Sequence, residues 1–171
     1  MKSILLAVMV VLPFLVKAQS PIDNIPFVDG EVKFETILNV EGSSAESLYA
    51  DTKLIISDIY KSGKAAIDVS DDDALFIVVK GITYYPFKDW LGTVAQKLDH
   101  TLKFQFKDGR MKVTLFDLEI NTIPIECVIR ECKGYRFNKR MRETHAREIL
   151  KTWENMQSQL ISGLEKDQDD W

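Results

Sequence analysis

The segment CVIREC contains Cys127 and Cys132, the only two thiols of this 171-residue chain, spaced as C-x4-C. Four roles fit such a pair: a disulfide, half of a metal site, a redox centre or two ordinary core residues. A zinc site needs four ligands, and no two further ligands accompany this pair. A redox pair is typically C-x-x-C beside a helix start, which is absent here. A disulfide or two free thiols remain, and an oxidising compartment favours the disulfide.

A bond between the two cysteines requires the chain to reverse direction between them. Five residues advance about 7.5 Å along a helix axis and about 16 Å along a strand. A disulfide needs α-carbon atoms within about 7 Å of each other. We therefore expect residues 128–131 to turn back on themselves if the bond forms.

The first residues of the chain indicate an oxidising compartment. Lys2 precedes an apolar run over residues 4–16, and small Ala18 precedes polar Gln19, a pattern typical of a signal peptide. The run is shorter than the roughly 20 apolar residues that cross a bilayer. We expect residues 1–18 to be cleaved near Ala18-Gln19, leaving a periplasmic or secreted chain without a transmembrane segment.

The charge balance argues against nucleic acid as a partner. The chain has 22 Lys and Arg against 26 Asp and Glu, a formal net charge of −4. Loss of Lys2 and Lys17 with the signal peptide would make this about −6. Phosphate contacts need a clustered positive surface, which a net negative charge disfavours.

Histidine is scarce, since the chain has only two. His100 falls on the apolar face of a predicted strand, where we expect a hydrogen-bonded core residue. His145 lies near the start of the last predicted helix among several arginines, where neighbouring positive charge disfavours its protonation and a surface role is expected. No G-x-S-x-G, H-E-x-x-H or phosphate-loop motif occurs. We predict no catalytic residue, metal site or cofactor.

Hydrophobic periodicity predicts the elements that must position these residues. Alternating apolar side chains predict strands over residues 31–40, 65–69, 74–87, 97–106 and 111–120. Helical spacing predicts one helix that begins at a Ser43–Glu46 capping box and ends at Gly63. A second, long helix after Asn138 is marked by Ile149, Trp153, Met156, Leu160 and Leu164.

The turns between the strands are equally clear. Asp71-Asp72-Asp73 reads as an acidic turn and not a calcium loop, because the central Gly and terminal Glu of the twelve-residue pattern are absent. Asp108-Gly109 is a hairpin signal. The alternation shifts phase at Leu115-Phe116, which indicates a bulge or burial on both faces.

The order of elements predicts an α+β fold, β-α-β4-α. Hairpin-linked strands give a mostly antiparallel sheet of about five strands, and the two helices cover one of its faces. The other face should be solvated and carries Lys97, Asp99, Thr101, Lys103 and Gln105. We expect a single domain over residues 31–164, preceded by an extended lead-in over 19–30 and followed by a polar tail over 165–171.

Two stretches, IPFVDGEVKFETILNVEG leading into the capped helix and LKFQFKDGRMKVTLFDLEI with its Asp-Gly hairpin, carry a family resemblance. In this order behind a signal peptide, from about Ile25 to Ile120, they resemble exported Bacteroidetes-type domains of unknown function with a fold like the TATA-binding protein. The resemblance implies a curved antiparallel sheet backed by helices and supplies no catalytic residues. The name of that fold does not imply DNA binding.

An aromatic cluster in the segment TYYPFKDW is one candidate ligand site. Exposed rings in a loop between strands can stack on sugars or anchor a protein partner. The alternative, which we favour, is that the rings cap one end of the core under the helices. The candidate residues are Tyr84, Tyr85, Phe87 and Trp90.

A basic run before and within the last helix is a second candidate. It is interrupted only by Glu131 and Glu143, so it could steer an anionic polymer, a lipid head group or an acidic partner. The alternative is a solvated helix face, which is the commoner role of such a run. The run comprises Arg130, Lys133, Arg136, Lys139, Arg140, Arg142 and Arg147.

Three functions remain open. The leading prediction is a non-catalytic envelope module that binds an envelope protein or polysaccharide through its open sheet face or the aromatic cluster. A second is an inhibitor or accessory subunit of an exported enzyme or secretion complex. A third is a cell-wall or polysaccharide hydrolase acting through carboxylates such as Glu35, Asp117 or Glu119, which would have to converge in a pocket with one raised pKa.

Overall fold

The structure, a computed structural model, describes residues 20–60, 66–88 and 92–169. The predicted signal peptide, the predicted helix end at Gly63 and the candidate site residue Trp90 lie outside these ranges.

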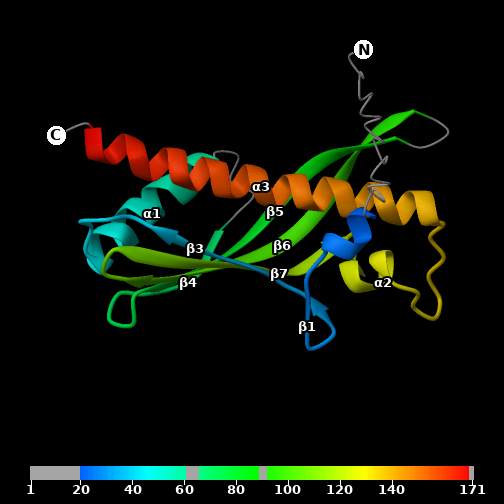
Figure 1. The fold of residues 1–171 in the computed structure, drawn as a ribbon, viewed down its shortest axis with the longest axis horizontal. Coiled ribbons are helices and arrows are strands. Elements are labelled where there is room, and N and C mark those ends of the chain that lie inside the picture. Colours follow the sequence, from blue (N-terminus) through cyan, green and yellow to red (C-terminus); the bar gives the residue numbers. More distant parts are fainter. Residues whose placement is uncertain (1–19, 61–65, 89–91, 170–171) are drawn as a thin grey trace, which may run out of the picture.

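An antiparallel sheet forms the base of the molecule (Figure 1). Its strand order is β3-β7-β6-β5-β4, with the short β8 added to β7, so it has one strand more than the sequence predicted. All of its paired neighbours are antiparallel. The bounds are Phe34–Asn39 (β3), Ala66–Asp71 (β4), Phe76–Lys88 (β5), Thr93–Lys107 (β6), Arg110–Ile120 (β7) and Ile123–Pro124 (β8).

Two helices, α1 (Ala45–Ile59) and α3 (Lys139–Asp169), lie on the same side of this sheet, and α3 crosses its whole length (Figure 1). The apolar stripe of α3 is buried as predicted, from Ile149 to Leu164. The α+β class and the helix-backed antiparallel sheet are therefore confirmed. Between β8 and α3, where an irregular stretch was expected, the chain also forms the short helix α2 (Ile125–Ile129).

The predicted first strand is split. Its beginning, β2 (Glu31–Val32), pairs with β1 (Phe27–Val28) in a separate two-stranded ribbon, and β3 starts only at Phe34. The connection between β1 and β2 is Asp29-Gly30, both with positive φ, as the turn prediction required. The lead-in is not wholly extended, because Pro21–Asn24 forms a 3-10 turn.

The start of α1 differs from the predicted capping box. Ser44, not Ser43, is the cap, and its hydroxyl accepts the backbone N–H of Ser47. The Asp108 carboxylate of the β6–β7 turn accepts the N–H of Ala45 at 3.0 Å. The hairpin and the helix start therefore stabilise each other, an arrangement that local sequence cannot indicate.

The bulge indicated by the phase shift in β7 is present, slightly further along the strand. Thr101 faces Phe116 and Asp99 faces Glu119, so β7 carries one extra residue, and Asp117 adopts φ 50°. The bulge restores the alternation, and Leu118 and Ile120 return to the core.

Gly81 in β5 permits a close approach in the core. Its partner across the sheet is His100, whose Nε2 shares a 2.8 Å hydrogen bond with the hydroxyl of Tyr60. A β-carbon at position 81 would lie 2.7 Å from that nitrogen and 2.8 Å from the Tyr60 ring. Only glycine leaves room for this pair.

We predict that Gly81→Ala lowers the free energy of unfolding by about 1–3 kcal/mol, because the added methyl group overpacks the Tyr60–His100 contact. Urea unfolding monitored by circular dichroism measures the loss. Lys80→Ala, one residue earlier and exposed, is the control and should change stability by less than about 0.5 kcal/mol. Equal midpoints for Gly81→Ala and the parent protein would contradict this role of Gly81.

Candidate functional site

Cys127 and Cys132 form a disulfide, and the chain reverses between them as the geometry demanded. Cys127 lies in α2, which ends at Ile129, and Arg130 is extended with φ −106° and ψ 170°. This break brings the two α-carbon atoms to 5.0 Å. The predicted pair therefore lies at the distance that a disulfide requires.

Three further contacts fix α2 to the body. The side chains of Ile125 and Val128 are fully buried. The Glu126 carboxylate accepts the backbone N–H of Val32 at 2.6 Å. The guanidinium of Arg130 stacks on the Phe27 ring, 3.4 Å from its centroid. These contacts hold the point at which the loop leaves α2.

We call residues 130–147 the basic segment. It carries seven basic and two acidic residues, a net charge of +5 in a chain whose formal charge is −4. Both carboxylates pair within the segment: Glu131 with Arg142 at 2.9 Å and Glu143 with Lys139 at 3.8 Å. Arg142 also donates to the Phe137 carbonyl, so it is a structural residue of the loop.

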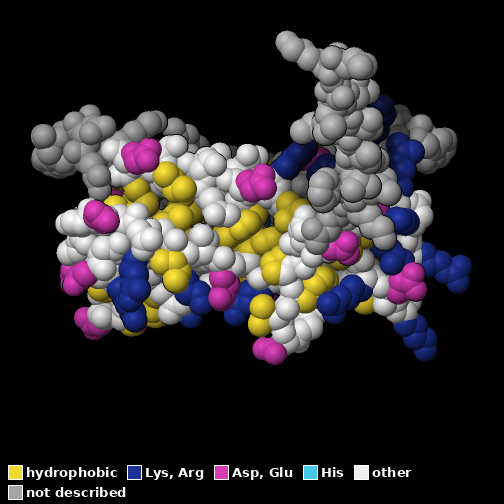
Figure 2. Space-filling view, in the orientation of Figure 1, with side chains coloured by type: hydrophobic (Ala, Val, Ile, Leu, Met, Phe, Trp, Pro, Cys, Tyr) yellow, Lys and Arg dark blue, Asp and Glu magenta, His cyan; other side chains and the backbone are white. Residues whose placement is uncertain are grey.

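The other cations of the segment are available to a partner. Within the described part of the chain, none of these four forms an ion pair, and all are exposed: Lys133, Arg136, Arg140 and Arg147. Figure 2 shows Lys and Arg side chains gathered at this end of the molecule, by α2 and the start of α3.

Tyr135 lies among these cations and is 41% exposed. Sequence reasoning missed it, although an aromatic residue between Gly134 and Arg136, just before a helix cap, was a usable signal. The cap is Asn138, whose side-chain oxygen accepts the N–H of Met141. The segment thus presents one aromatic ring flanked by cations on a loop with a fixed base.

The aromatic cluster does not form a loop site. Tyr84, Tyr85 and Phe87 all belong to β5, so the predicted loop is strand. Tyr85 and Phe87 point into the core at 4% and 7% exposure, and Tyr84 lies on the opposite face at 52%. The favoured alternative, rings that cap the core under a helix, holds for Tyr85 and Phe87.

His145 was expected at the surface, and that prediction is wrong. It is buried in the first turns of α3, where Nδ1 shares a 2.7 Å hydrogen bond with the Tyr85 hydroxyl. Its ring stacks on Phe87 at 4.4 Å between centroids. Loss of hydration, not the neighbouring arginines, lowers the pKa of His145 to about 4.

His100 is the core residue that was predicted. Besides Tyr60, its Nδ1 faces the Leu98 carbonyl at 3.3 Å, and burial lowers its pKa to about 4. Both histidines of the chain are thus buried and paired with a tyrosine hydroxyl. His145 is 2% exposed, and His100, although it lines the hollow at the β7 bulge, is 3% exposed.

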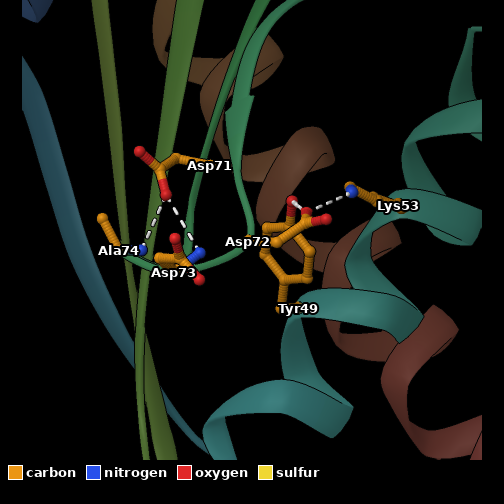
Figure 3. A network of polar contacts seen from close by, with 6 residues as sticks. All are labelled: Tyr49, Lys53, Asp71, Asp72, Asp73 and Ala74. Atoms are coloured by element: carbon orange, nitrogen blue, oxygen red, sulfur yellow. Dashed lines mark hydrogen bonds and ion pairs between the residues drawn. The ribbon is translucent and has the colours of Figure 1, made fainter.

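The acidic turn has a structural role (Figure 3). One Asp71 oxygen accepts the backbone N–H groups of Asp73 and Ala74, which closes the turn. Asp72 points away toward α1, where it binds the Tyr49 hydroxyl and the Lys53 ammonium group. Hydrogen bonds from Tyr49 and then Lys53 lower the pKa of Asp72. The turn thereby fastens the β4–β5 hairpin to α1.

The three carboxylates of the hydrolase hypothesis do not form one site. Asp117 and Glu119 line a shallow hollow at the β7 bulge, together with Lys80 and Asp99. Glu35 lies elsewhere on the face, bound to Lys112 at 3.0 Å. The hydrogen bond from Lys112 lowers the pKa of Glu35, the opposite of what a general acid needs.

Neither a metal site nor a membrane span stands out in the described ranges. There, no three His, Cys, Asp or Glu side chains cluster so as to hold a metal ion. Nor does any helix there have the length and apolar character to cross a bilayer.

Comparison with known proteins identifies the fold. The model of a family described as "Domain of unknown function (DUF4468) with TBP-like fold" matches residues 34–121, about half of the chain. No curated protein matches significantly.

Two crystal structures are similar to this chain. A DUF4468 family protein from Bacteroides ovatus superposes with a TM-score of 0.70 at 17% identity, over 82% of this chain and 90% of that one. A TBP-like protein from Parabacteroides distasonis gives 0.69 at 13% identity, over 82% and 97%. The resemblance seen in the sequence is confirmed for family and fold.

We predict no free thiol in the unfolded, non-reduced protein, because Cys127 and Cys132 are bonded. Titration with a thiol reagent in denaturant checks this, and two thiols per chain would contradict it. Replacing both by Ser should cost about 2 kcal/mol of unfolding free energy, since the closed loop is short. The reduced parent protein is the matched control and should be equally destabilised.

We predict that stability falls as the pH drops from about 6.5 toward 4. The folded pKa values of His100 and His145 lie near 4, below the unfolded value of about 6.5, so the unfolded chain binds more protons in this window. The stabilisation is complete above pH 6.5 and lost on acidification, at up to about 3 kcal/mol per histidine.

Urea unfolding between pH 7.5 and 4.5 measures this slope. The range stops at 4.5 because the carboxyls of Glu35 and Asp72, with lowered pKa values, lose their contribution mainly below it. The double variant His100→Gln/His145→Gln should show a flatter profile whatever its absolute stability. An unchanged slope would exclude the histidines as its cause.

Proposed function

The chain belongs to the DUF4468 family of domains with a TBP-like fold, whose function is unknown, and we propose that this member is an exported, non-catalytic binding module of the cell envelope. Its partner is an envelope protein with an acidic surface patch. The observation that carries the proposal is the disulfide-pinned basic segment, in which the exposed residues Lys133 and Arg136 flank exposed Tyr135 along the chain.

Charge separation supports this choice of surface. A segment with a net charge of +5 stands out in a chain whose formal charge is −4, so the attraction for an acidic partner is concentrated at one end of the molecule. The acidic groups of the segment are already paired internally. Lys133, Arg136 and Arg140 keep their charge for the partner.

Preorganisation supports it further. Ordering a loop costs free energy on binding, and a loop that is already held loses less. Here the Cys127–Cys132 bond and the Arg130–Phe27 stack fix the base of the loop. Tyr and Arg are also the side chains most often found at the energetic centre of protein interfaces.

The non-catalytic part rests on what the other polar groups do. Both histidines are buried in tyrosine pairs, and Glu35 is held in an ion pair away from Asp117 and Glu119. A signal-peptide pattern at residues 1–18 supports export.

We predict that neutralising the segment with Lys133→Gln, Arg136→Gln and Arg140→Gln abolishes capture of the partner. The immobilised protein is challenged with envelope extract, and bound proteins are identified and quantified at about 0.05 and 0.5 M salt. The parent protein should retain the partner about tenfold more at low salt, because screening weakens exposed charges.

The matched control removes three charges elsewhere, with Lys80→Gln, Lys88→Gln and Lys151→Gln, and should bind like the parent. Tyr135→Ala should weaken capture at either salt concentration. Equal loss of capture in both triple variants would show that capture depends only on the net charge of the protein. Capture of polysaccharide without protein would replace the proposed partner with an anionic polymer.

A further inference from the structure

A second cationic feature lies on the open face of the sheet, at the end opposite the basic segment. The β6–β7 hairpin and α2 are at opposite ends of the molecule (Figure 1). Beside this hairpin is a hollow of about 430 Å³, within the usual range for small-ligand pockets. Its lining includes Ile37, Leu75, Gln105, Lys107, Arg110 and Lys112.

Sheet register brings the polar members of this lining together. Lys112 faces Gln105 on one side and Ile37 on the other, and Arg110 faces Lys107 directly. Residues that face each other across strands have β-carbon atoms about 5 Å apart. The amide and three cations therefore share one small patch.

The pair of Lys107 and Arg110 is unusual because like charges directly opposed across strands destabilise a sheet. Lys112 is compensated by Glu35 at 3.0 Å. Lys107 and Arg110 are exposed, and neither forms an ion pair within the ranges that the structure describes. A bound anion would remove this repulsion.

The nearby carboxylates do not supply that anion. Asp108 in the hairpin turn accepts the N–H of Ala45 on the helix side. Asp71 closes its own turn, and Asp72 points to α1 (Figure 3). None of the described residues that line the hollow is acidic.

We propose that this hollow, which we call the hairpin pocket, binds an anionic monosaccharide: a sugar-sized body that bears one carboxylate or phosphate group. The planar guanidinium of Arg110 and the ammonium of Lys107 hold the anionic group. The Gln105 amide binds a ring hydroxyl. Ile37, which is 57% exposed, and Leu75 form apolar walls against the faces of the ring.

The test is a titration of the isotope-labelled full chain followed by amide chemical shifts. The probes are glucuronate, glucose 1-phosphate, inorganic phosphate and neutral glucose. The expected result is a saturable shift with one or both sugar acids, confined to residues 37, 74–75 and 105–112. The two sugar acids distinguish a carboxylate ligand from a phosphate ligand.

Arg110→Gln should weaken the binding about tenfold or more without lowering the thermal midpoint, since it removes a repulsive neighbour of Lys107. Lys88→Gln, exposed at the far end of β5, is the matched control and should bind like the parent. Rescue of binding by Arg110→Lys to an intermediate level would support a charge contact that is partly bidentate.

Several results would overturn the proposal. These are no saturable shift with either sugar acid, equal shifts with glucose, binding unaffected by Arg110→Gln, or shifts located in residues 130–147. Inorganic phosphate binding as tightly as both sugar acids would refute the sugar-sized body. None of these outcomes bears on capture through the basic segment, whose variants lie at the other end of the molecule.

Discussion

The docking of His145 between Tyr85 and Phe87 fixes the position of α3 on the sheet. The imidazole can form the 2.7 Å hydrogen bond to Tyr85 and stack on Phe87 in only one orientation. A shift of α3 by one residue would rotate it by about 100° and would remove His145, Ile149 and Trp153 from the core together. Because a helix is a stiff rod, this contact also sets where α3 begins. The path of the loop back to α2, and hence the display of the basic segment, follows from it.

Because the helices cover only one face of the sheet, apolar and charged side chains are separated onto different faces. The covered face takes the apolar residues and both histidines, which are neutral there because hydration of the charged form is lost. The open face and the two ends of the sheet keep the charged side chains. In the part of the chain that the structure describes, charged side chains remain accessible on the open face, at the hairpin ends and on the α2–α3 loop. The two cationic surfaces occupy such places.

Local periodicity was enough to predict the five longer strands, the long helix and their order, because each depends on neighbours within a few residues. The disulfide could be predicted for a similar reason, since its geometry is decided over six residues. His145 was misplaced because its partners, Tyr85 and Phe87, lie some sixty residues away, and charge near it in sequence is a poor guide to burial. The hairpin pocket could not be predicted from the sequence, because it depends on the register of β3, β7 and β6 and on the position of the β4–β5 turn.

The opposition of Lys107 and Arg110 has no explanation in folding. The Asp108-Gly109 turn needs its own two residues, the first to accept the N–H of Ala45 at the start of α1 and the second, at φ 70°, to reverse the chain. The flanking positions are exposed, and a pair of opposite charges there would stabilise the hairpin. The chain instead places two cations face to face, with a third, Lys112, two residues further along β7. Local choices that oppose stability are expected at functional sites, where a ligand supplies the missing interaction. The same reasoning separates this pair from the cations of the basic segment, which lie on the α2–α3 loop and in the first turns of α3 and are not paired across strands.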